Sequence, residues 1–167
     1  MHAKLKNKRK NHSSVVINEA LWVLGGHGLN STEYIYVNGT VVAGPNLPVI
    51  ISGHCSVTLN DGKVMIIGGS SSLIPKLRSV LIFSPNNNSF TTGPSLIHHR
   101  SNYACTHFYS PMHDNRPVVL SAGGKFQFKA EILDYTTANA KWEQSKHCCL
   151  LGYEVIHYLS LQKCQYH

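Results

Sequence analysis

The sequence predicts an all-β fold in which one strand-rich unit is repeated. Three glycine doublets carry this prediction, each at the end of a short, mostly apolar run: Gly25-Gly26, Gly68-Gly69 and Gly123-Gly124. The doublets lie 43 and 55 residues apart, a spacing typical of one supersecondary unit used several times. Strand-length apolar runs separated by turn-forming residues recur around each doublet, and together these features predict the blades of a β-propeller.

Two strands are predicted before each doublet. Segment 12–26 aligns with segment 54–69 with one gap, and in both copies apolar and polar residues alternate before an asparagine-containing turn. A third copy, 103–124, is longer because segment 109–117 carries two prolines and several polar residues. We expect a surface loop there.

Two further strands are predicted after each doublet. The apolar runs 34–37, 80–83 and 132–135 are candidate third strands, and their aromatic residues mark the repeat: Tyr36, Phe83 and Tyr135. Each fourth strand is anchored by a large apolar residue at a constant distance from the next linker: Val41, Phe90 and Trp142. We expect the bulky Phe90, Tyr135 and Trp142 to fill the gaps between blades.

The segments between repeats also keep a constant spacing. Arg100 stands four residues after Leu96, and Arg9 stands four residues after Leu5 in the N-terminal segment. This match predicts that the first repeat begins before residue 12. In the linker between these two, Ile51 takes the place of the arginine, so an arginine is not obligatory for packing at this position.

This pattern resembles the kelch repeat family, in which a glycine doublet ends the second strand, aromatic residues mark the third and a tryptophan stands in the fourth. The resemblance covers nearly the whole chain, although Val41 and Phe90 replace the family's tryptophan and only Trp142 keeps it. It implies four-stranded antiparallel blades packed around a central axis. The doublets would permit an unusual φ and a close backbone approach. The prediction is a kelch-type propeller segment of about three blades and the start of a fourth.

The predicted domain organisation follows the doublets. A basic segment, 1–11, is expected to be the linker into the first blade, and three repeats and an incomplete fourth repeat or tail follow: 12–53, 54–102, 103–152 and 153–167. Propellers generally carry about four to eight blades. The chain is therefore expected to be a fragment, to associate with further blades or to expose apolar faces, and the missing fourth doublet favours the fragment.

The composition fits one small β-rich domain, with 167 residues of which 43% are hydrophobic and 14% charged. No stretch is long enough to span a membrane, and nothing near the start resembles a signal peptide, although a truncated N-terminus could have lost one. The net charge is +7, and five of these charges come from Lys4, Lys6, Lys8, Arg9 and Lys10. Such a cluster is either a nucleic-acid or nuclear-localisation tail or a solvated linker. The repeat spacing favours the linker, so no nucleic-acid partner is expected.

The cysteines favour a reducing compartment. Cys55, Cys105, Cys148, Cys149 and Cys164 form no C-x-x-C pair and are odd in number, so a cytoplasmic location is expected. Cys55 and Cys105 fall on first strands, where a small buried hydrophobe suits the core. Adjacent Cys148 and Cys149 give poor tetrahedral geometry, so no metal is expected at the C-terminal histidines and cysteines, and no cofactor elsewhere.

No catalytic site is predicted. The sequence contains no G-x-S-x-G, no P-loop and no paired-carboxylate motif. Some copper radical oxidases share a kelch-type propeller and need two tyrosines, two histidines and a nearby cysteine. This chain contains those residue types without a recognisable grouping, so an oxidase fragment is only a remote alternative to a non-enzyme.

The resemblance implies a partner-binding face, because kelch propellers commonly bind partners through loops after the doublets and loops between blades. Here these loops are 27–32, 70–76, 125–129, 46–52, 95–101 and 146–151, and they contain no acidic residue. The candidate partner-binding residues are His27, Asn30, Ser71, Lys76, His98, His99, Arg100, Lys125 and Lys129. We therefore expect a protein partner of acidic character. Two interpretations of segment 98–100 stay open: recognition of that partner, or a solvated loop whose arginine bonds nearby carbonyls.

The predicted function is non-catalytic protein binding through one propeller face. One setting is a substrate adaptor of a cullin-type ubiquitin ligase, although no BTB-like region precedes the repeats. The alternative is a secreted or cell-surface binding protein. Glycosylation sequons at Asn11, Asn30, Asn38 and Asn87 keep this alternative open, although roughly two would arise by chance.

Overall fold

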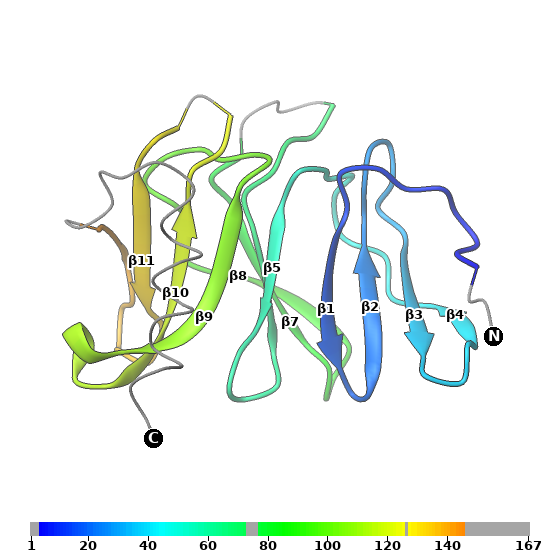
Figure 1. Cartoon of the computed structure of the whole chain (residues 1–167), viewed down its shortest axis with the longest axis horizontal. Coiled ribbons are helices and arrows are strands. Elements are labelled where there is room, and N and C mark those ends of the chain that lie inside the picture. The colour runs from blue at the N-terminus through cyan, green and yellow to red at the C-terminus, as the bar shows by residue number, and fades with distance from the viewer. Residues whose placement is uncertain (1–3, 73–76, 126, 146–167) are drawn as a thin grey trace, which may run out of the picture.

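Three four-stranded antiparallel sheets make up the computed structural model, which describes residues 4–72, 77–125 and 127–145 (Figure 1). The first sheet contains β1 (Ser13–Ile17), β2 (Ala20–Leu24), β3 (Thr32–Tyr36) and β4 (Val41–Ala43). The second contains β5 (Cys55–Thr58), β6 (Val64–Ile67), β7 (Val80–Ser84) and β8 (Ser89–Thr92). The third contains β9 (Ala104–Ser110), β10 (Arg116–Ala122), β11 (Ala130–Asp134) and β12 (Trp142–Gln144). The all-β prediction of four-stranded antiparallel blades is confirmed.

In every sheet the strands follow chain order, so each blade is a meander of antiparallel neighbours. The loop expected at 109–117 is shorter than predicted, because β9 and β10 extend into it and a short 3-10 helix, η1 (Pro111–His113), joins them. Within the described residues, no helix has the length and apolar character needed to cross a membrane. The predicted fourth repeat, 153–167, lies outside the described residues, as do Cys148, Cys149 and Cys164.

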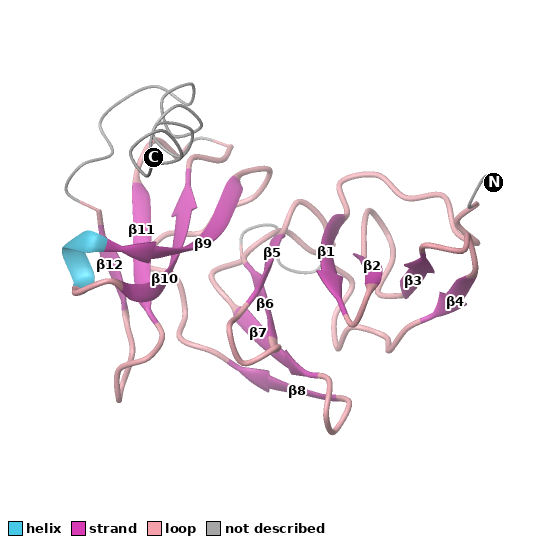
Figure 2. Ribbon diagram, turned by 60° about the horizontal axis from the view of Figure 1, so that its bottom comes forward, coloured by secondary structure: helices cyan, strands magenta, loops and turns pink. Residues whose placement is uncertain are grey.

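The first strands of neighbouring sheets lie side by side: β1 contacts β5, and β5 contacts β9. The sheets fan out from this contact, as the turned view shows (Figure 2). Such an arrangement of first strands is that of propeller blades around an axis.

Cys55 of β5 and Cys105 of β9 form a disulfide, with their Cα atoms 6.0 Å apart. This separation lies within the range that a disulfide can span. The expectation that both cysteines serve only as packing residues is therefore wrong. The cysteine count could not show that first strands of adjacent blades are neighbours, and the count no longer supports a cytoplasmic location.

Two apolar clusters fill the spaces between neighbouring sheets. Trp22 of the first sheet meets Phe83 of the second with ring centroids 4.6 Å apart, and Phe90 packs against the same cluster. Trp142 of the third sheet is buried against the second, and its indole Nε1 donates to the carbonyl oxygen of Pro94 at 2.8 Å. Tyr135 packs against this second cluster. Phe90, Tyr135 and Trp142 thus lie between blades, as expected.

The third strand of the second blade begins at residue 80 as predicted, but the other two third strands begin earlier than their apolar runs suggested. β3 starts at residue 32 and β11 at residue 130, so the aromatic markers are not at equivalent positions. Tyr36 is the last residue of β3, Phe83 the fourth of β7, and Tyr135 follows β11. Glu33 and Glu131 explain the error in the predicted strand starts. A charged residue usually indicates a loop, but these two are fully buried inside strands.

The fourth-strand anchors are equivalent, as the constant spacing predicted. Each pairs with the fourth residue of its third strand: Val41 with Ile35, Phe90 with Phe83, and Trp142 with Leu133. The spacing to the buried Leu47 and Leu96 therefore reflects a real structural register.

The first two glycine doublets hold successive linkers together. The amide of Gly26 donates to the carbonyl oxygen of Ile51 at 2.9 Å, and that of Gly69 donates to Arg100 at 2.7 Å. A Cβ on the preceding residue, Gly25 or Gly68, would lie only 2.7 or 2.8 Å from these same oxygens. Both preceding glycines also have φ near +60°, at +57° and +58°. Close approach and positive φ together therefore require glycine there.

Candidate protein-binding face

The loops that follow the glycine doublets gather at one end of the three sheets (Figure 1). We call this end the doublet face, and it comprises residues 4–12, 25–31, 44–54, 68–72, 77–79, 93–103, 123–125 and 127–129. We call the opposite end the hairpin end, and it comprises residues 18–19, 37–40, 59–63, 85–88, 111–115 and 135–141. Since the strands are antiparallel, the chain alternates between these two ends.

One backbone hydrogen bond recurs on the doublet face in all three blades. The residue after each doublet donates its amide to the linker that enters the same blade: His27 to Lys10 at 3.0 Å, Ser70 to Ser52 at 2.8 Å and Lys125 to Ser101 at 2.9 Å. The doublet face is thus a repeated backbone scaffold, and its chemistry is set by the side chains that the scaffold displays.

A cavity of about 180 Å³ opens on the doublet face between the first two blades. It unites three of the predicted loops and is lined by His27, Gly28, Ile50, Ser52, Ser70, Ser71 and Ser72. The side chain of His27 is exposed, and Ile50 adds apolar surface because 43% of it is exposed. The candidate residues His27 and Ser71 therefore lie together.

Arg100 is a structural residue and not an exposed contact. It is only 1% exposed, and its Nη2 lies 2.9 Å from Oε1 of the buried Glu131. Its Nη1 donates to the carbonyl oxygens of Gly123 and Lys129. Arg100 thus bonds nearby carbonyl oxygens, as one of the two interpretations expected, and it is not available to a partner.

His98 is turned towards the same buried carboxylate. Its backbone amide donates to Oε1 of Glu131 at 3.0 Å, and its Nδ1 lies 3.2 Å from that oxygen. The side chain is 31% exposed, and His99 beside it is half-buried. Neither histidine is as open as the sequence suggested.

The remaining candidates divide into supporting and exposed residues. Asn30 supports the loop, because its Nδ2 donates to the carbonyl oxygen of Leu47 at 3.2 Å and its side chain is half-buried. Lys125 and Lys129 are exposed, and Nζ of Lys129 lies 3.5 Å from Oε1 of Gln144. Lys76 lies outside the described residues.

The structure adds exposed cations to the doublet face that sequence reasoning did not assign to it: Lys6, Lys8, Lys10 and Arg78. The backbone of Lys10 is bonded to a residue that lines the cavity, since its carbonyl oxygen accepts the amide of His27. Arg78 leads into β7 and donates to the carbonyl oxygen of Ile97 at 3.4 Å. The position of Lys10 on this face could have been predicted from the repeat, because it stands one residue after Arg9.

No acidic residue of the described chain is exposed on this surface. Glu33 and Glu131 are buried against Arg9 and Arg100. Most other described acidic residues lie at the hairpin end or at the end of β11 beside it, where lysine or arginine partners approach several of them: Glu19, Asp61, Asp114 and Asp134. Glu143 lies on β12. Among the described residues, the exposed charges of the doublet face are therefore all positive.

The Glu33 carboxylate is held in its charged form despite its burial. Burial raises the pKa of this carboxyl, but hydrogen bonds from the Arg9 side chain, the Lys6 amide and Asn7 outweigh that effect and lower it. Its oxygens receive the Lys6 amide at 2.7 Å and Nη2 of Arg9 at 2.7 Å. The basic segment is thus bound to β3 of the first blade.

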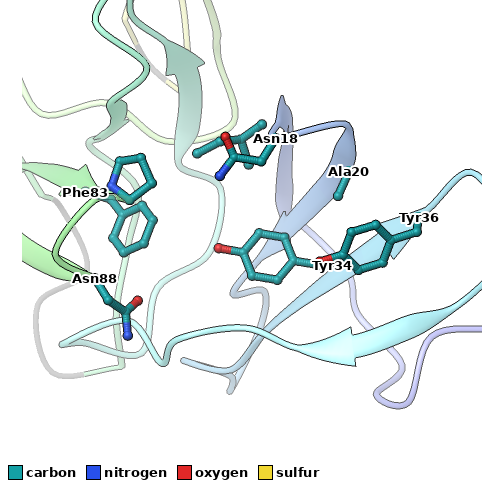
Figure 3. A pocket seen from close by; sticks show the side chains of 8 residues that line it. Asn18, Ala20, Tyr34, Tyr36, Phe83 and Asn88 are labelled. Carbon is teal, nitrogen blue, oxygen red and sulfur yellow. The ribbon is translucent and has the colours of Figure 1, made fainter.

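A second cavity, of about 230 Å³, lies at the hairpin end between the first two blades (Figure 3). Tyr34 reaches from β3 towards Phe83 and Asn88 of the second sheet, with Asn18 beside it. Burial raises the pKa of the Tyr34 phenol. The lining offers amides, phenols and apolar groups, so it can hydrogen-bond and stack but holds no charged side chain. Within the described part of the chain, no group of three or more His, Cys, Asp or Glu could hold a metal ion.

Comparison with known proteins identifies the class to which this fold belongs. The chain is similar to a solved structure described as "Structure of YjhT", with a TM-score of 0.67 and 15% sequence identity over 81% of this chain and 51% of that one. This chain therefore spans about half the length of that protein, and the likeness shows the fold: these sheets are β-propeller blades. Residues 52–97, which hold the second sheet, match the kelch motif. The second blade is therefore similar to a kelch repeat, and all three sheets have the fold of propeller blades. A comparison with curated proteins gives no match.

Proposed function

We propose that this chain is a non-catalytic protein-binding module that takes an acidic partner on the doublet face. The kelch motif and the propeller fold support a protein-interaction module in general. The observation that carries the finer proposal is the separation of charge between the two ends of the blades. Exposed cations occupy the doublet face, and the carboxylates of the described residues lie in buried ion pairs, at the other end or on β12.

The cavity between the first two blades gives this surface a centre. A partner segment could place a carboxylate near Lys10 and an apolar side chain against Ile50, while the serines offer hydrogen bonds. Exposed charges are screened over about 8 Å at physiological ionic strength. The cations would therefore act mainly on the association rate and on the choice of an acidic partner over a basic one.

A charge-reversal experiment tests this proposal with a fluorescent glutamate-rich peptide as the probe. Lys10→Glu combined with Lys125→Glu should weaken peptide binding by about tenfold or more, measured by fluorescence anisotropy at low salt. Lys141→Glu is the matched control, because Lys141 is an exposed lysine at the hairpin end. The control should bind nearly as well as the unchanged protein. Equal weakening in both variants, or none in either, would contradict a site on the doublet face.

The disulfide favours the secreted or cell-surface setting over an intracellular ligase adaptor. Disulfides persist in oxidising compartments and are rare in the cytosol. Alkylation of free thiols in intact producing cells, followed by peptide mass spectrometry, should leave Cys55 and Cys105 unlabelled and joined to each other. Recovery of both residues as alkylated thiols would favour the intracellular adaptor instead.

A further inference from the structure

We infer that Asn38 and Asn87 carry N-linked glycans. Each begins an Asn-x-Ser/Thr sequon, and each lies in the turn between the third and fourth strands of its blade. Both asparagines are exposed. The same turn of two consecutive blades therefore presents an acceptor site at the hairpin end, and this inference does not depend on the proposed partner.

The geometry of both turns engages the oxygen of the asparagine side chain. Oδ1 of Asn38 accepts the amide of Thr40 at 2.9 Å, and Oδ1 of Asn87 accepts the hydroxyl of Ser89 at 2.8 Å. A glycan attaches through the other atom of the carboxamide, Nδ2. In each turn, the third residue of the sequon thus already contacts the asparagine that would be modified.

Asn30 provides the contrasting case within the same chain. Its sequon is intact, but its Nδ2 donates to the carbonyl oxygen of Leu47 at 3.2 Å and its side chain is half-buried. A glycan on Nδ2 would have to displace the linker that carries Leu47, a residue only 1% exposed. The folded protein is therefore expected to leave Asn30 unmodified.

The disulfide supplies the independent observation. Cys55 and Cys105 are joined across two blades, and such bonds form in the oxidising compartments through which glycosylated proteins pass. A sequon can arise by chance, so it is weak evidence by itself. Exposed sequons and a disulfide in the same chain are both explained by passage through an oxidising compartment. Both features indicate passage through a secretory compartment.

The modification is a transfer from a lipid-pyrophosphate-linked oligosaccharide. A bond forms between Nδ2 and the anomeric carbon of the first sugar, and the bond from that carbon to the pyrophosphate oxygen breaks. The lipid pyrophosphate leaves with the electron pair, and the proton lost by Nδ2 passes to a base of the transferase. The chain itself supplies only the acceptor amide and the sequon hydroxyl.

Glycans at these positions would divide the molecule into two functional ends. Pro85 and Asn88, from the turn that carries Asn87, and Tyr36, close to Asn38, line the cavity at the hairpin end. Sugars on both turns would flank that cavity and hinder a macromolecular partner there. Neither of these two turns lies on the doublet face, which is at the other end of the strands.

The experiment uses protein isolated from the cells that produce it. Treatment with peptide N-glycosidase in heavy-oxygen water converts each glycosylated asparagine to a heavy-oxygen-labelled aspartate. Mass spectrometry should find this label at positions 38 and 87 and not at 30. Recovery of all the protein with unlabelled asparagine at 38 and 87 would overturn the inference, as would label at 30 alone.

Sequon variants secreted from eukaryotic cells provide the second measurement. Thr40→Val and Ser89→Ala should each reduce the mass of the secreted chain by one glycan, and Thr40→Ser, which keeps its sequon, should not. Both positions lie at the start of the fourth strand of their blade, Thr40 directly before β4 and Ser89 as the first residue of β8, and the intact Cys55–Cys105 bond reports that each variant has folded. Unchanged masses in Thr40→Val and Ser89→Ala would overturn the assignment. If a variant is not secreted, the enzyme-treated unchanged protein decides.

Discussion

The linkers that enter the first and third blades are fixed to the third strand of their blade by an ion pair. The linker that enters the second blade is fixed by apolar packing. Arg9 pairs with Glu33 and Arg100 with Glu131, and both pairs are fully buried. At the equivalent positions of the second blade stand Ile51, which is 3% exposed, and Leu81. One backbone arrangement therefore tolerates two chemically opposite solutions.

The two arginines make matching contacts, which shows that their role is architectural. Nη1 of Arg9 donates to the carbonyl oxygens of Gly25 at 2.8 Å and Ser31 at 2.6 Å, so it ties the first doublet to the start of β3. Nη1 of Arg100 donates in the same way on either side of the third doublet loop. A buried ion pair often gives no more stability than an apolar pair of similar size, but half of one is strongly destabilising.

The largest expected effect on stability comes from removing one partner of a buried arginine–glutamate pair. Glu131→Ala leaves the Arg100 guanidinium buried without its carboxylate, and should lower the free energy of unfolding by about 3 to 5 kcal/mol. The double variant Arg100→Ile with Glu131→Leu copies the second blade and should recover most of the loss. Denaturant unfolding measures both, and Glu143→Ala, at an exposed position of β12, is the control. If the double variant is no more stable than Glu131→Ala, the two solutions are not interchangeable.

The junctions between first strands extend the comparison. The first residue of β5, Cys55, is bonded to the second residue of β9, Cys105. At the equivalent positions one junction earlier, the hydroxyls of Ser13 and Ser56 share a hydrogen bond at 2.6 Å. The second and third blades are therefore joined covalently where the first and second are joined by a hydrogen bond.

Replacing the disulfide by a pair of serines, as at the junction of the first two blades, should lower the free energy of unfolding by less than the loss of half an ion pair. The double variant Cys55→Ser with Cys105→Ser opens a loop that spans a sequence separation of 50 and should lower the free energy of unfolding by about 2 to 4 kcal/mol. Denaturant unfolding with and without reductant measures this. Reductant should destabilise the unchanged protein and leave the double variant unaffected. Equal sensitivity of both proteins to reductant would show that Cys55–Cys105 is not the stabilising bond.

His54 and Tyr103 occupy equivalent places in the linkers of the second and third blades and differ in their partners. Tyr103 donates its hydroxyl to the carbonyl oxygen of Ile67 at 2.6 Å. His54 is 5% exposed, and neither ring nitrogen has a hydrogen-bond partner among the described residues. Burial, with a smaller contribution from His12, lowers the pKa of His54 from 6.5 to about 4.

This lowered pKa predicts a loss of stability in acid. Below pH 6.5 the unfolded chain binds a proton at His54, and the folded chain does not until the pH falls to about 4. The contribution is therefore fully present above pH 6.5 and is lost as the pH falls to about 4, by up to about 3 kcal/mol. His54→Tyr, which copies the third blade, should reduce this pH dependence. Denaturation midpoints across this interval test it, and an unchanged slope in the variant would exclude His54 as the source.

The repeat framework was predictable because it rests on local spacing. Val41, Phe90 and Trp142 proved equivalent since a fourth strand places its anchor at a fixed distance from the linker. The start of the third strand was missed in the first and third blades because Glu33 and Glu131 are charged. Their contacts with an arginine and with backbone amides far away in the sequence explain why such residues can be buried.

The candidate face was predictable in its loops but not in its exposed residues. Doublets and linkers predicted which loops gather at one end of the blades, since loop position follows from strand order. Burial of Arg100 and exposure of Lys10 and Arg78 depend on side-chain direction, which loop sequences do not encode. The Cys55–Cys105 bond was missed for a related reason, because it joins neighbours across blades and not along the chain.

The smallest expected effect concerns the junction that has no covalent bond. Ser13→Ala removes one hydroxyl of the pair with Ser56 and should lower the free energy of unfolding by about 1 kcal/mol, with the exposed Ser14→Ala as the control. Ser13→Cys combined with Ser56→Cys tests the equivalence of the two junctions directly. Because these positions match those of Cys55 and Cys105, the new thiols should oxidise to a second disulfide, detected as a loss of free thiol. If the new thiols stay reduced while Cys55–Cys105 forms, the first strands meet with different geometry at the two junctions. The Ser13–Ser56 position is then not equivalent to that of the disulfide.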